Sequence, residues 1–400
     1  MRIEYKRLKD CCTKIGSGAT PKGGSSVYID SGVSLIRSQN VYNLKFSYSG
    51  LAHINDEAAN KLKGVIVNKG DVLLNITGDS VARTCVVPDE VLPARVNQHV
   101  SIIRPNKDVD SRYLNYYLAS PAMQGYLLNI ASTGASRNAI TKGMIEKLVI
   151  PFPDMDSQRR IASILSAYDN LIENNNKRIR LLEQMAENLY KEWFVRFRFP
   201  GHEKAEFENG LPKGWSLKNL FDVADVSYGY AFKSDLFCND KNLNAVVRIR
   251  DIQDNHTDTY TSEVCDDKYL IEENAILVGM DGLFHMCLWN GEKAYLNQRV
   301  VKICSKKKDM CNYMIFMAIR PQIKFWEQVI AGTTVAHLGD KHLKKIKIAV
   351  PTEDLLLKAN ESIQRIMVEK NQLFKQNQIL SRQRDLLLPR LMSGKLKVNV

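Results

Sequence analysis

The chain has 400 residues, 44% hydrophobic and 25% charged, a composition typical of a globular protein of two or three domains. Its 56 Lys and Arg against 44 Asp and Glu give a net charge of +12, which fits a polyanionic partner such as DNA but also serves solubility alone. No run of about 18 apolar residues predicts a membrane span. The N-terminus lacks the apolar core of a signal peptide, so we expect a cytoplasmic protein.

The first half of the chain predicts an α+β domain followed by a long helix. Residues 1–150 alternate short β-like runs, such as Gly64–Asn68 and Val100–Arg104, with turn signals, and a helical stretch from Ser111 ends at Pro121. Beyond Pro153, residues 157–193 read as one helix of roughly 55 Å. Residues 202–215, with several Gly and Pro, predict a linker.

The second half repeats the first. ARVNQHV at 94–100 is answered by AYLNQRV at 294–300, and the segment 147–153 by 345–351. A helical stretch at 311–319 again ends at a proline, Pro321, and a second long helix spans 359–388, ending near Pro389 and Gly394. A repeat of about 200 residues is too long for a solenoid. It predicts two similar α+β domains, 1–153 and 201–351, in a pseudo-twofold relation, separated by long helices in 154–200 and 352–400.

Both long helices carry heptads, which predict an antiparallel coiled coil. In the register that matches most apolar positions, Ile161 faces Leu391 and Asn175 faces Asn377, a polar pair able to fix the register. The predicted interface consists of Ile161, Leu165, Ile172, Asn175, Ile179, Leu182, Leu189, Ile363, Leu373, Asn377, Leu380, Leu387 and Leu391. The alternative is that each helix packs separately on its own domain.

Catalytic motifs are absent from the sequence. No two prolines are adjacent, which excludes the loop with which amino-methyltransferases hold a flipped base, and no phosphate-binding loop or nuclease motif occurs. The glycines at 16, 18, 23 and 24 look like a flexible loop. The eight cysteines show no zinc spacing, so we expect reduced thiols and no metal site. No residue is predicted to be catalytic.

Polar and basic residues in both copies could instead read DNA, because Asn and Gln suit adenine and Arg suits guanine. The candidates are Arg37, Gln39, Asn40, Asn97, Gln98, His99, Ser136, Arg137, Asn138, Arg248, Arg250, Asn297, Gln298, Arg299, Thr333, Thr334, His337 and Lys341. The Asn-Gln pairs common to both copies are better explained as turn builders. Residues that differ between the segments 133–138 and 332–337, which we align, are better candidates for sequence specificity.

Four segments give the chain a family resemblance. Pro151–Ala162, Leu181–Phe194, Leu211–Trp215 and Leu386–Lys395, together with the duplication, resemble the specificity subunits of type I restriction–modification enzymes over essentially the whole length. One departure is that the second copy has Glu353–Lys358 where the first has the more family-like Asp156–Ile161.

The resemblance implies two target-recognition domains that bind the two halves of a bipartite, asymmetric site in double-stranded DNA, with the long helices as a spacer. Two modification subunits would methylate adenine with S-adenosylmethionine, and restriction subunits would use ATP and Mg²⁺. The chain itself would hold no cofactor and catalyse nothing.

Two other hypotheses stay open, a stand-alone DNA-binding or scaffold protein and a degraded two-domain enzyme. An exposed apolar face on the long helices would favour the subunit. Tyr168, Tyr190, Trp193 and Phe194 are candidates for that face or, alternatively, for the coiled-coil core.

Overall fold

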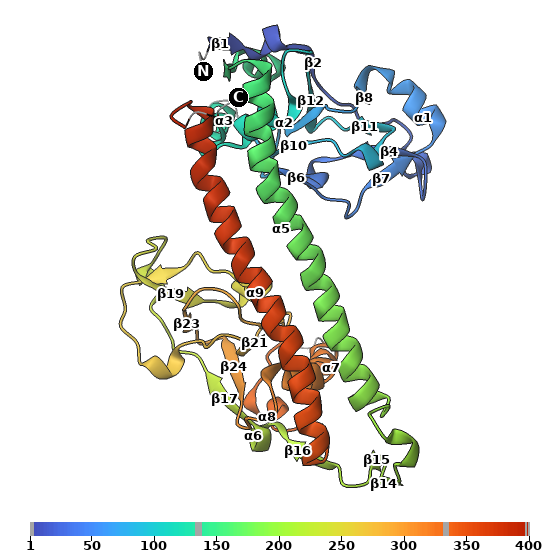
Figure 1. Ribbon diagram of the computed structural model, residues 1–400, viewed down its shortest axis with the longest axis vertical. Coiled ribbons are helices and arrows are strands. Elements are labelled where there is room, and N and C mark those ends of the chain that lie inside the picture. The colour runs from blue at the N-terminus through green and yellow to red at the C-terminus, as the bar shows by residue number, and fades with distance from the viewer. Residues whose placement is uncertain (1–3, 133–137, 331–335, 397, 399–400) are drawn as a thin grey trace. The chain divides into compact units, whose positions relative to one another are not determined.

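The computed structural model of the chain describes residues 4–132, 138–330, 336–396 and 398 (Figure 1). It divides into two compact units: unit 1 comprises Met1–Asn174 with Asn377–Val400, and unit 2 comprises Asn175–Gln376. Each unit therefore contains a part of both long helices, α5 (Met155–Tyr190) and α9 (Glu353–Met392).

Two larger sheets, two pairs of strands and four helices build unit 1, besides its parts of the long helices. The strands are β1 (Glu4–Arg7), β2 (Cys12–Ser17), β3 (Tyr28–Ile29), β4 (Val33–Ile36), β5 (Val41–Tyr42), β6 (Lys45–Phe46), β7 (Ala52–Ile54), β8 (Ile66–Val67), β9 (Val72–Asn75), β10 (Thr84–Val86), β11 (Ala94–Val96), β12 (Val100–Pro105) and β13 (Val149–Phe152). The helices are α1 (Asp56–Lys61), α2 (Ser111–Ala119), α3 (Pro121–Ser132) and α4 (Lys142–Lys147). One sheet has the order β10-β9-β12-β2 and the other β3-β7-β4-β11-β8, while α2, α3 and α4 form the helical layer.

The order of layers follows from the two-residue period of the central strands. Every residue of β9 is buried, because successive side chains point to opposite faces and both faces are covered. Val72 and Leu74 join the core shared with α2, α3 and α4, whereas Leu73 and Ile102 join the core shared with the five-stranded sheet. The four-stranded sheet is thus the middle layer of the domain.

Unit 2 repeats this plan. Its strands are β14 (Phe207–Glu208), β15 (Leu211–Pro212), β16 (Ser216–Asn219), β17 (Ala224–Tyr228), β18 (Phe237–Cys238), β19 (Asn244–Val247), β20 (Tyr260–Thr261), β21 (Ile276–Gly279), β22 (Met286–Leu288), β23 (Tyr295–Leu296), β24 (Val300–Ser305) and β25 (Lys347–Val350). Its helices are α6 (Leu220–Val223), α7 (Asn312–Ile330) and α8 (Asp340–Leu343). The sheet β17-β24-β21-β22 has the order of β2-β12-β9-β10, and β19 pairs with β23 in parallel as β4 does with β11. The predicted duplication of an α+β domain is confirmed.

The helix ends predicted at prolines are partly wrong. In unit 1, α2 ends at Ala119 and a new helix begins at Pro121, a position that suits proline because the first helical N–H has no partner in any case. In unit 2, α7 continues through Pro321 to Ile330. The neighbouring Gln322 side chain donates to the carbonyls of Ala318, at 3.1 Å, and of Lys347, at 2.8 Å, which ties the helix to β25 beyond the proline.

The second long helix is longer at both ends than the sequence predicted. It begins at Glu353 rather than near residue 359, and it passes through Pro389 to Met392. Pro389 lies in the last turn and has no N–H to donate to the Asp385 carbonyl, so the helix lacks one hydrogen bond close to its end. The first long helix ends in a π-helical turn at Lys191–Val195.

In both units α5 and α9 pack against each other in opposite directions (Figure 1). Within unit 2, Arg178 pairs with Glu369 at 2.8 Å and Glu183 with Lys370 at 3.7 Å. Within unit 1, Asp169 pairs with Arg384 at 2.5 Å. Also within unit 2, Asn175 contacts Gln376, so between Asn175 and Arg178 rising numbers on α5 meet falling numbers on α9, as the heptads predicted.

All thirteen predicted interface residues are buried or half-buried. Within unit 1, Ile161 and Leu391 share a core cluster, and within unit 2 Leu189 and Ile363 do. The Asn175 amide donates to Gln376 Oε1 at 3.0 Å. Its pairing with Asn377 would join residues of different units and stays a prediction.

The long helices also belong to the domain cores, so the two alternatives for their packing are not exclusive. In unit 2, Tyr190 and Phe194 are buried against the sheet and α7, and their rings stack with centroids 4.9 Å apart. In unit 1, Leu165 of α5 and Leu388 of α9 share a cluster with Tyr113 of α2. None of the helices in the described part of the chain is long and apolar enough to cross a membrane.

Lys370 provides a stability test of this packing. Its side chain is 8% exposed beside Glu183, and burial lowers the pKa of Lys370 from its usual 10.5 although Glu183 opposes the shift. Lys370→Met should raise the free energy of unfolding by about 1 kcal/mol, because an apolar side chain escapes the cost of burying a charge.

The matched control is Lys375→Met on the same helix. Lys375 is 60% exposed and pairs with Glu273 at 2.9 Å, so its replacement should change stability little. The measurement is chemical unfolding of the three proteins at pH 7. A Lys370→Met protein less stable than the control would contradict the inference that burial of the Lys370 charge lowers the free energy of unfolding.

Candidate nucleic-acid interface

Three loops of unit 1 meet at one end of the central sheet. The Ile76 N–H donates to the carbonyl of His99 at 3.0 Å, which joins the loop after β9 to the turn between β11 and β12. The Ile140 N–H donates to the Ile76 carbonyl at 2.8 Å, and the Gly78 N–H to the Asn138 carbonyl at 3.3 Å, so the segment before α4 joins as well. Main-chain bonds therefore hold the three loops together.

Unit 2 makes the same cluster with the same bonds. The Met280 N–H donates to the Arg299 carbonyl at 3.0 Å, Leu338 N–H to the Met280 carbonyl at 2.7 Å, and Gly282 N–H to the Ala336 carbonyl at 3.0 Å. Gly78 and Gly282 occupy equivalent places, with φ of 74° and 71°, a conformation that favours glycine.

These bonds correct our alignment of the third loop by one residue. Asn138 is equivalent to Ala336, not to His337. Ala139, which bridges to Thr77, is the equivalent of His337, which bridges to Asp281. The variable sequence before these positions gave the alignment no anchor.

In each unit a glycine that follows the first strand of the central sheet, β2 or β17, packs against the turn of the cluster. A Cβ on Gly18 would lie 2.0 Å from the Val96 carbonyl oxygen, and one on Gly229 would lie 2.0 Å from that of Asn297. The expectation of a flexible loop around Gly16 and Gly18 is therefore wrong, because Gly16 lies in β2 and Gly18 is in close backbone contact.

The side chains on the unit 1 cluster form a polar chain. Gln98 is exposed and accepts from the Thr20 hydroxyl, and its Nε2 lies 3.1 Å from His99 Nε2. His99 Nδ1 lies 2.6 Å from the Thr77 hydroxyl. Asn138 is exposed beside them. Amide, imidazole and hydroxyl groups at a fixed surface suit hydrogen bonding to base edges.

The unit 2 cluster carries charge at the equivalent positions. Asp281 contacts Arg299 Nε at 3.3 Å through Oδ2 and His337 Nδ1 at 2.6 Å through Oδ1. Gln298 and Arg299 are exposed on the turn. The backbones of the two clusters therefore match while their chemistry differs.

Other candidates build the loops. Asn97 and Asn297 are buried, and Asn97 Oδ1 accepts the His99 N–H at 3.1 Å, the turn role that we favoured. Asn40 is fully buried and donates to the Ser47 carbonyl at 2.9 Å. The side chains of these three residues are therefore buried within their loops.

A fourth loop adjoins each cluster. In unit 1 it carries Arg37 and Gln39, which donate to the Gly50 carbonyl at 2.7 and 3.1 Å. In unit 2 the Arg248 guanidinium lies 5.4 Å from the centre of the Phe237 ring, and Arg250 donates to Thr259 at 3.0 Å. Lys341 is exposed on α8. The candidates Ser136, Arg137, Thr333 and Thr334 lie outside the described residues.

Thr77 and Asp281 were missed by the sequence analysis. Each follows a buried strand and precedes a glycine, Gly78 or Gly282, which was the available signal. The partners of both side chains come from other loops, so their importance appears only in the folded chain. In the ranges that the structure describes, no group of three His, Cys, Asp or Glu side chains is arranged to hold a metal ion.

His342 anchors the segment beside the unit 2 cluster. Its Nδ1 accepts the Gly339 N–H at 3.0 Å, which caps α8. Burial, followed by the charges of Lys341 and Lys345, lowers the pKa of His342 from its usual 6.5, so the neutral ring is the folded form.

Comparison with known proteins bears directly on this duplicated architecture. Residues 2–184 and 212–383 match the model of the type I restriction modification DNA specificity domain. The chain belongs to this family. The first match begins in unit 1 and ends in α5, and the second begins in unit 2 and ends in α9. The match confirms the resemblance seen in the sequence.

Relatives within the family share nearly the full length. The type I restriction enzyme MjaIX specificity subunit of Methanocaldococcus jannaschii is 26% identical, over 99% of this chain and 94% of its own. The HindI specificity subunit of Haemophilus influenzae is 22% identical, over 91% and 94%. The S subunit of a type I system from M. genitalium has a similar fold, with a TM-score of 0.61 at 13% identity over 100% of this chain and 97% of that one.

The close contact at Gly18 predicts that a larger residue at this position lowers the stability of the chain. Gly18→Ala should lower the free energy of unfolding by about 1–3 kcal/mol, because the backbone carbonyl of Val96 must move. Gly16→Ala is the control, since no atom lies within 4 Å of the added Cβ. Thermal unfolding measures both, and an equal effect of the two changes would refute the close approach.

His342 gives a prediction of pH dependence. The unfolded chain binds a proton at this residue more readily than the folded chain, so the stabilisation is present above about pH 6.5 and is lost as the pH falls through the lower folded pKa. The unfolding temperature should therefore drop less between pH 7.5 and 5.5 in His342→Asn, which keeps an acceptor but does not titrate. An unchanged drop would contradict the assignment.

Proposed function

We propose that this chain is the sequence-specific DNA-binding specificity subunit of a type I restriction–modification complex. Each unit recognises one half of a bipartite, asymmetric site in double-stranded DNA. The observation that carries the proposal is the pair of loop clusters, with one set of backbone bonds and different exposed side chains. His99 stands where Arg299 stands, and Thr77 where Asp281 stands. Equal scaffolds with unequal polar surfaces suit two different half-sites.

The chemistry of the complex belongs to its partners in this proposal. Modification subunits, which we expect to be two, transfer the methyl group of S-adenosylmethionine to adenine, and restriction subunits use ATP and Mg²⁺. The sequence supports this division, because it has neither adjacent prolines for a base-flipping loop nor a phosphate-binding loop. The chain then supplies recognition without catalysis.

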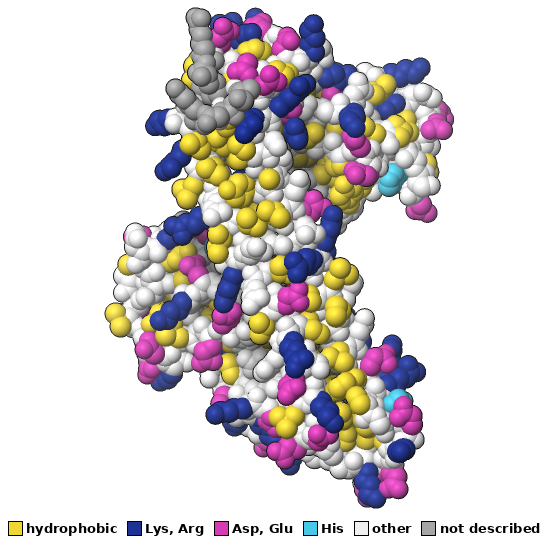
Figure 2. Space-filling model, viewed as in Figure 1, with side chains coloured by type: hydrophobic (Ala, Val, Ile, Leu, Met, Phe, Trp, Pro, Cys, Tyr) yellow, Lys and Arg dark blue, Asp and Glu magenta, His cyan; other side chains and the backbone are white. Residues whose placement is uncertain are grey.

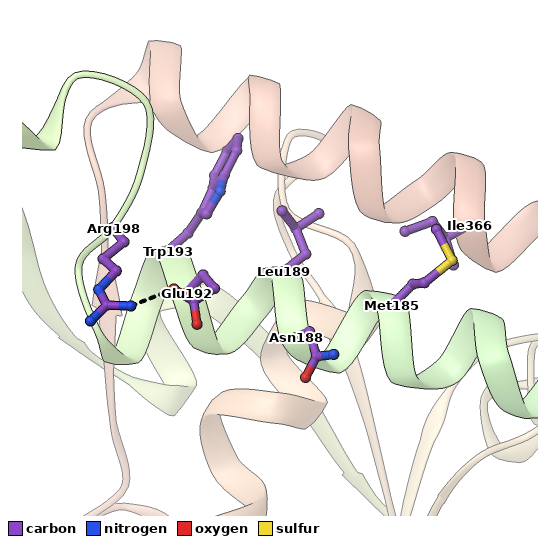
Figure 3. Close-up of a pocket in the computed structure, with 7 residues that line it drawn as sticks. All are labelled: Met185, Asn188, Leu189, Glu192, Trp193, Arg198 and Ile366. Atoms are coloured by element: carbon purple, nitrogen blue, oxygen red, sulfur yellow. Dashed lines mark ion pairs between the residues drawn. The ribbon is translucent and has the colours of Figure 1, made fainter.

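Apolar side chains on the long helices support a protein partner. Leu181 and Met185 of α5 are 59% and 56% exposed, and Figure 2 shows hydrophobic side chains at the surface of this region. A groove of about 550 Å³ lies beside them, lined by Met185, Leu189, Trp193 and Ile366, with the ion pair of Glu192 and Arg198 at one end (Figure 3). We propose that a modification subunit covers this surface.

The sequence candidates for that surface divide accordingly. Tyr190 and Phe194 belong to the core of unit 2. Trp193 is half-buried and lines the groove, and Tyr168 is half-buried on α5. Leu181 and Met185, which the heptad pattern did not single out, are more exposed than any of the four.

The function is tested by the methylation pattern of cells that make the chain with the modification subunit of the same system. We expect a bipartite motif with methyladenine in each half, read by single-molecule sequencing. The purified chain alone should transfer no methyl group to DNA. A partner that is active with another specificity subunit but gains no methylation from this chain would contradict the proposal.

Exchange of one unit tests whether each unit recognises its own half of the site. Replacing residues 1–153 by the equivalent part of a relative should change one half of the motif and leave the other unchanged, because each cluster is built within its own unit. The matched exchange of residues 201–351 should change the other half. If either exchange altered both halves, independent recognition by the two units would be wrong.

A further inference from the structure

We propose that Asp281 is a positioning residue that aims Arg299 and His337 at a G·C base pair in the half-site recognised by unit 2. The inference deepens the proposed function and rests on it. It concerns a carboxylate that the sequence analysis did not select, and it assigns a base preference to one of the two units.

The three side chains form one arrangement built from three loops. Asp281 is 27% exposed, and it lies between Arg299, which is 54% exposed, and His337, which is 45% exposed. One carboxylate oxygen contacts each partner, at 3.3 and 2.6 Å. The donors are therefore outermost and the carboxylate sits behind them.

The backbone makes this arrangement rigid. Asp281 bridges to His337 in antiparallel fashion, and the flanking residues Met280 and Gly282 bond to the other two loops. A side chain of two torsions on a fixed backbone can restrict a long arginine, which otherwise loses rotamer freedom on binding.

The carboxylate favours contact with a base over contact with a phosphate. A negative group beside Arg299 and His337 offsets their attraction for phosphate oxygens and repels the phosphate itself. Orientation, in contrast, is what base recognition needs. The guanidinium fork pairs with O6 and N7 of guanine in the major groove, and a carboxylate can accept from the N4 amino group of the paired cytosine.

His337 adds a second directional group. A carboxylate only accepts, so the hydrogen between the two lies on Nδ1 of His337, and Nε2 is left as the polar atom that meets a ligand. Asp281 thus sets the tautomer of one partner and the direction of the other.

Unit 1 has the same backbone bonds but lacks the orienting carboxylate and its two partners. Thr77 replaces Asp281, Ala139 replaces His337 and His99 replaces Arg299. Thr77 stands at the position of Asp281, so a hydroxyl and an imidazole face the ligand there instead of a carboxylate and a guanidinium. The G·C preference is accordingly assigned to unit 2 alone.

The test compares the full complex carrying Asp281→Asn, Arg299→Lys or Arg299→Ala with the wild type. The matched control is Asp225→Asn, which removes the same charge from unit 2 at a side chain that is 69% exposed and pairs only loosely with Lys306, at 3.7 Å. Two readouts are taken: the methylated motif in cells, and binding of the purified complex to duplexes varied at each position of the motif.

We expect the half-site of unit 2 to contain a G·C pair. In Asp281→Asn and in Arg299→Lys, discrimination between this pair and the other base pairs should fall about ten-fold or more, at that one position. The other half-site and the thermal unfolding of the complex should not change. Asp225→Asn should behave as the wild type does. A merely structural role of Asp281 would weaken every duplex alike and lower the unfolding temperature.

Three results would overturn the inference. The first two are a unit 2 half-site without a G·C pair and a motif that is unchanged in both Asp281→Asn and Arg299→Lys. The third is an Arg299→Ala protein that binds all duplexes more weakly and whose salt dependence is reduced by one contact, because this pattern identifies a phosphate contact. In each of these the wild-type complex still shows a bipartite motif. Failure of the proposed function is distinct, because the wild type would then show no motif.

Discussion

The antiparallel packing of α5 against α9 is the interaction on which both recognition units depend. In unit 2 the fully buried Ala186 and Ala359 belong to the same core as Ile276 of the central sheet. In unit 1 the fully buried Ala162 lies in a cluster with Leu391 and Tyr113. Side chains this small allow close approach of the elements that carry them.

The long helices are therefore structural parts of each unit and not connectors attached to finished domains. A change in the helix pair is expected to reach the sheets through these shared cores, since packed interiors transmit strain. Within unit 2, Leu181 and Met185 are exposed on α5 and available to a protein partner, whereas Ala186 and Tyr190 of the same helix are buried in the core.

Repeated segments were enough to predict the duplication, and the pattern of apolar residues was enough to predict the α+β class and the direction of the helix pair. These sequence patterns failed where a contact between distant residues decides the local structure. The helix α7 continues through Pro321, and the next side chain, Gln322, bonds to β25. The third loop aligns one residue away from our alignment because backbone bonds to Met280 and Ile76 define it.

The candidate site was predicted in outline only. Gln98, His99, Gln298 and Arg299 lie on the clusters, whereas Asn40, Asn97 and Asn297 turned out to be buried parts of the turns. Asp281 could not be singled out from sequence, because its two partners are brought to it by separate loops. Burial and hydrogen-bond partners, which a sequence does not contain, separate loop builders from the residues that face a ligand.

The central claim, that one cluster meets each half of the site, is tested most directly by photocrosslinking. A photoreactive residue replaces Gln98 in one protein and Gln298 in another, both exposed at equivalent turns, and the crosslinked bases are mapped in the assembled complex on its DNA. The account predicts crosslinks from position 98 to one half-site and from position 298 to the other. Crosslinks from both positions to the same half, or to flanking DNA alone, would contradict it.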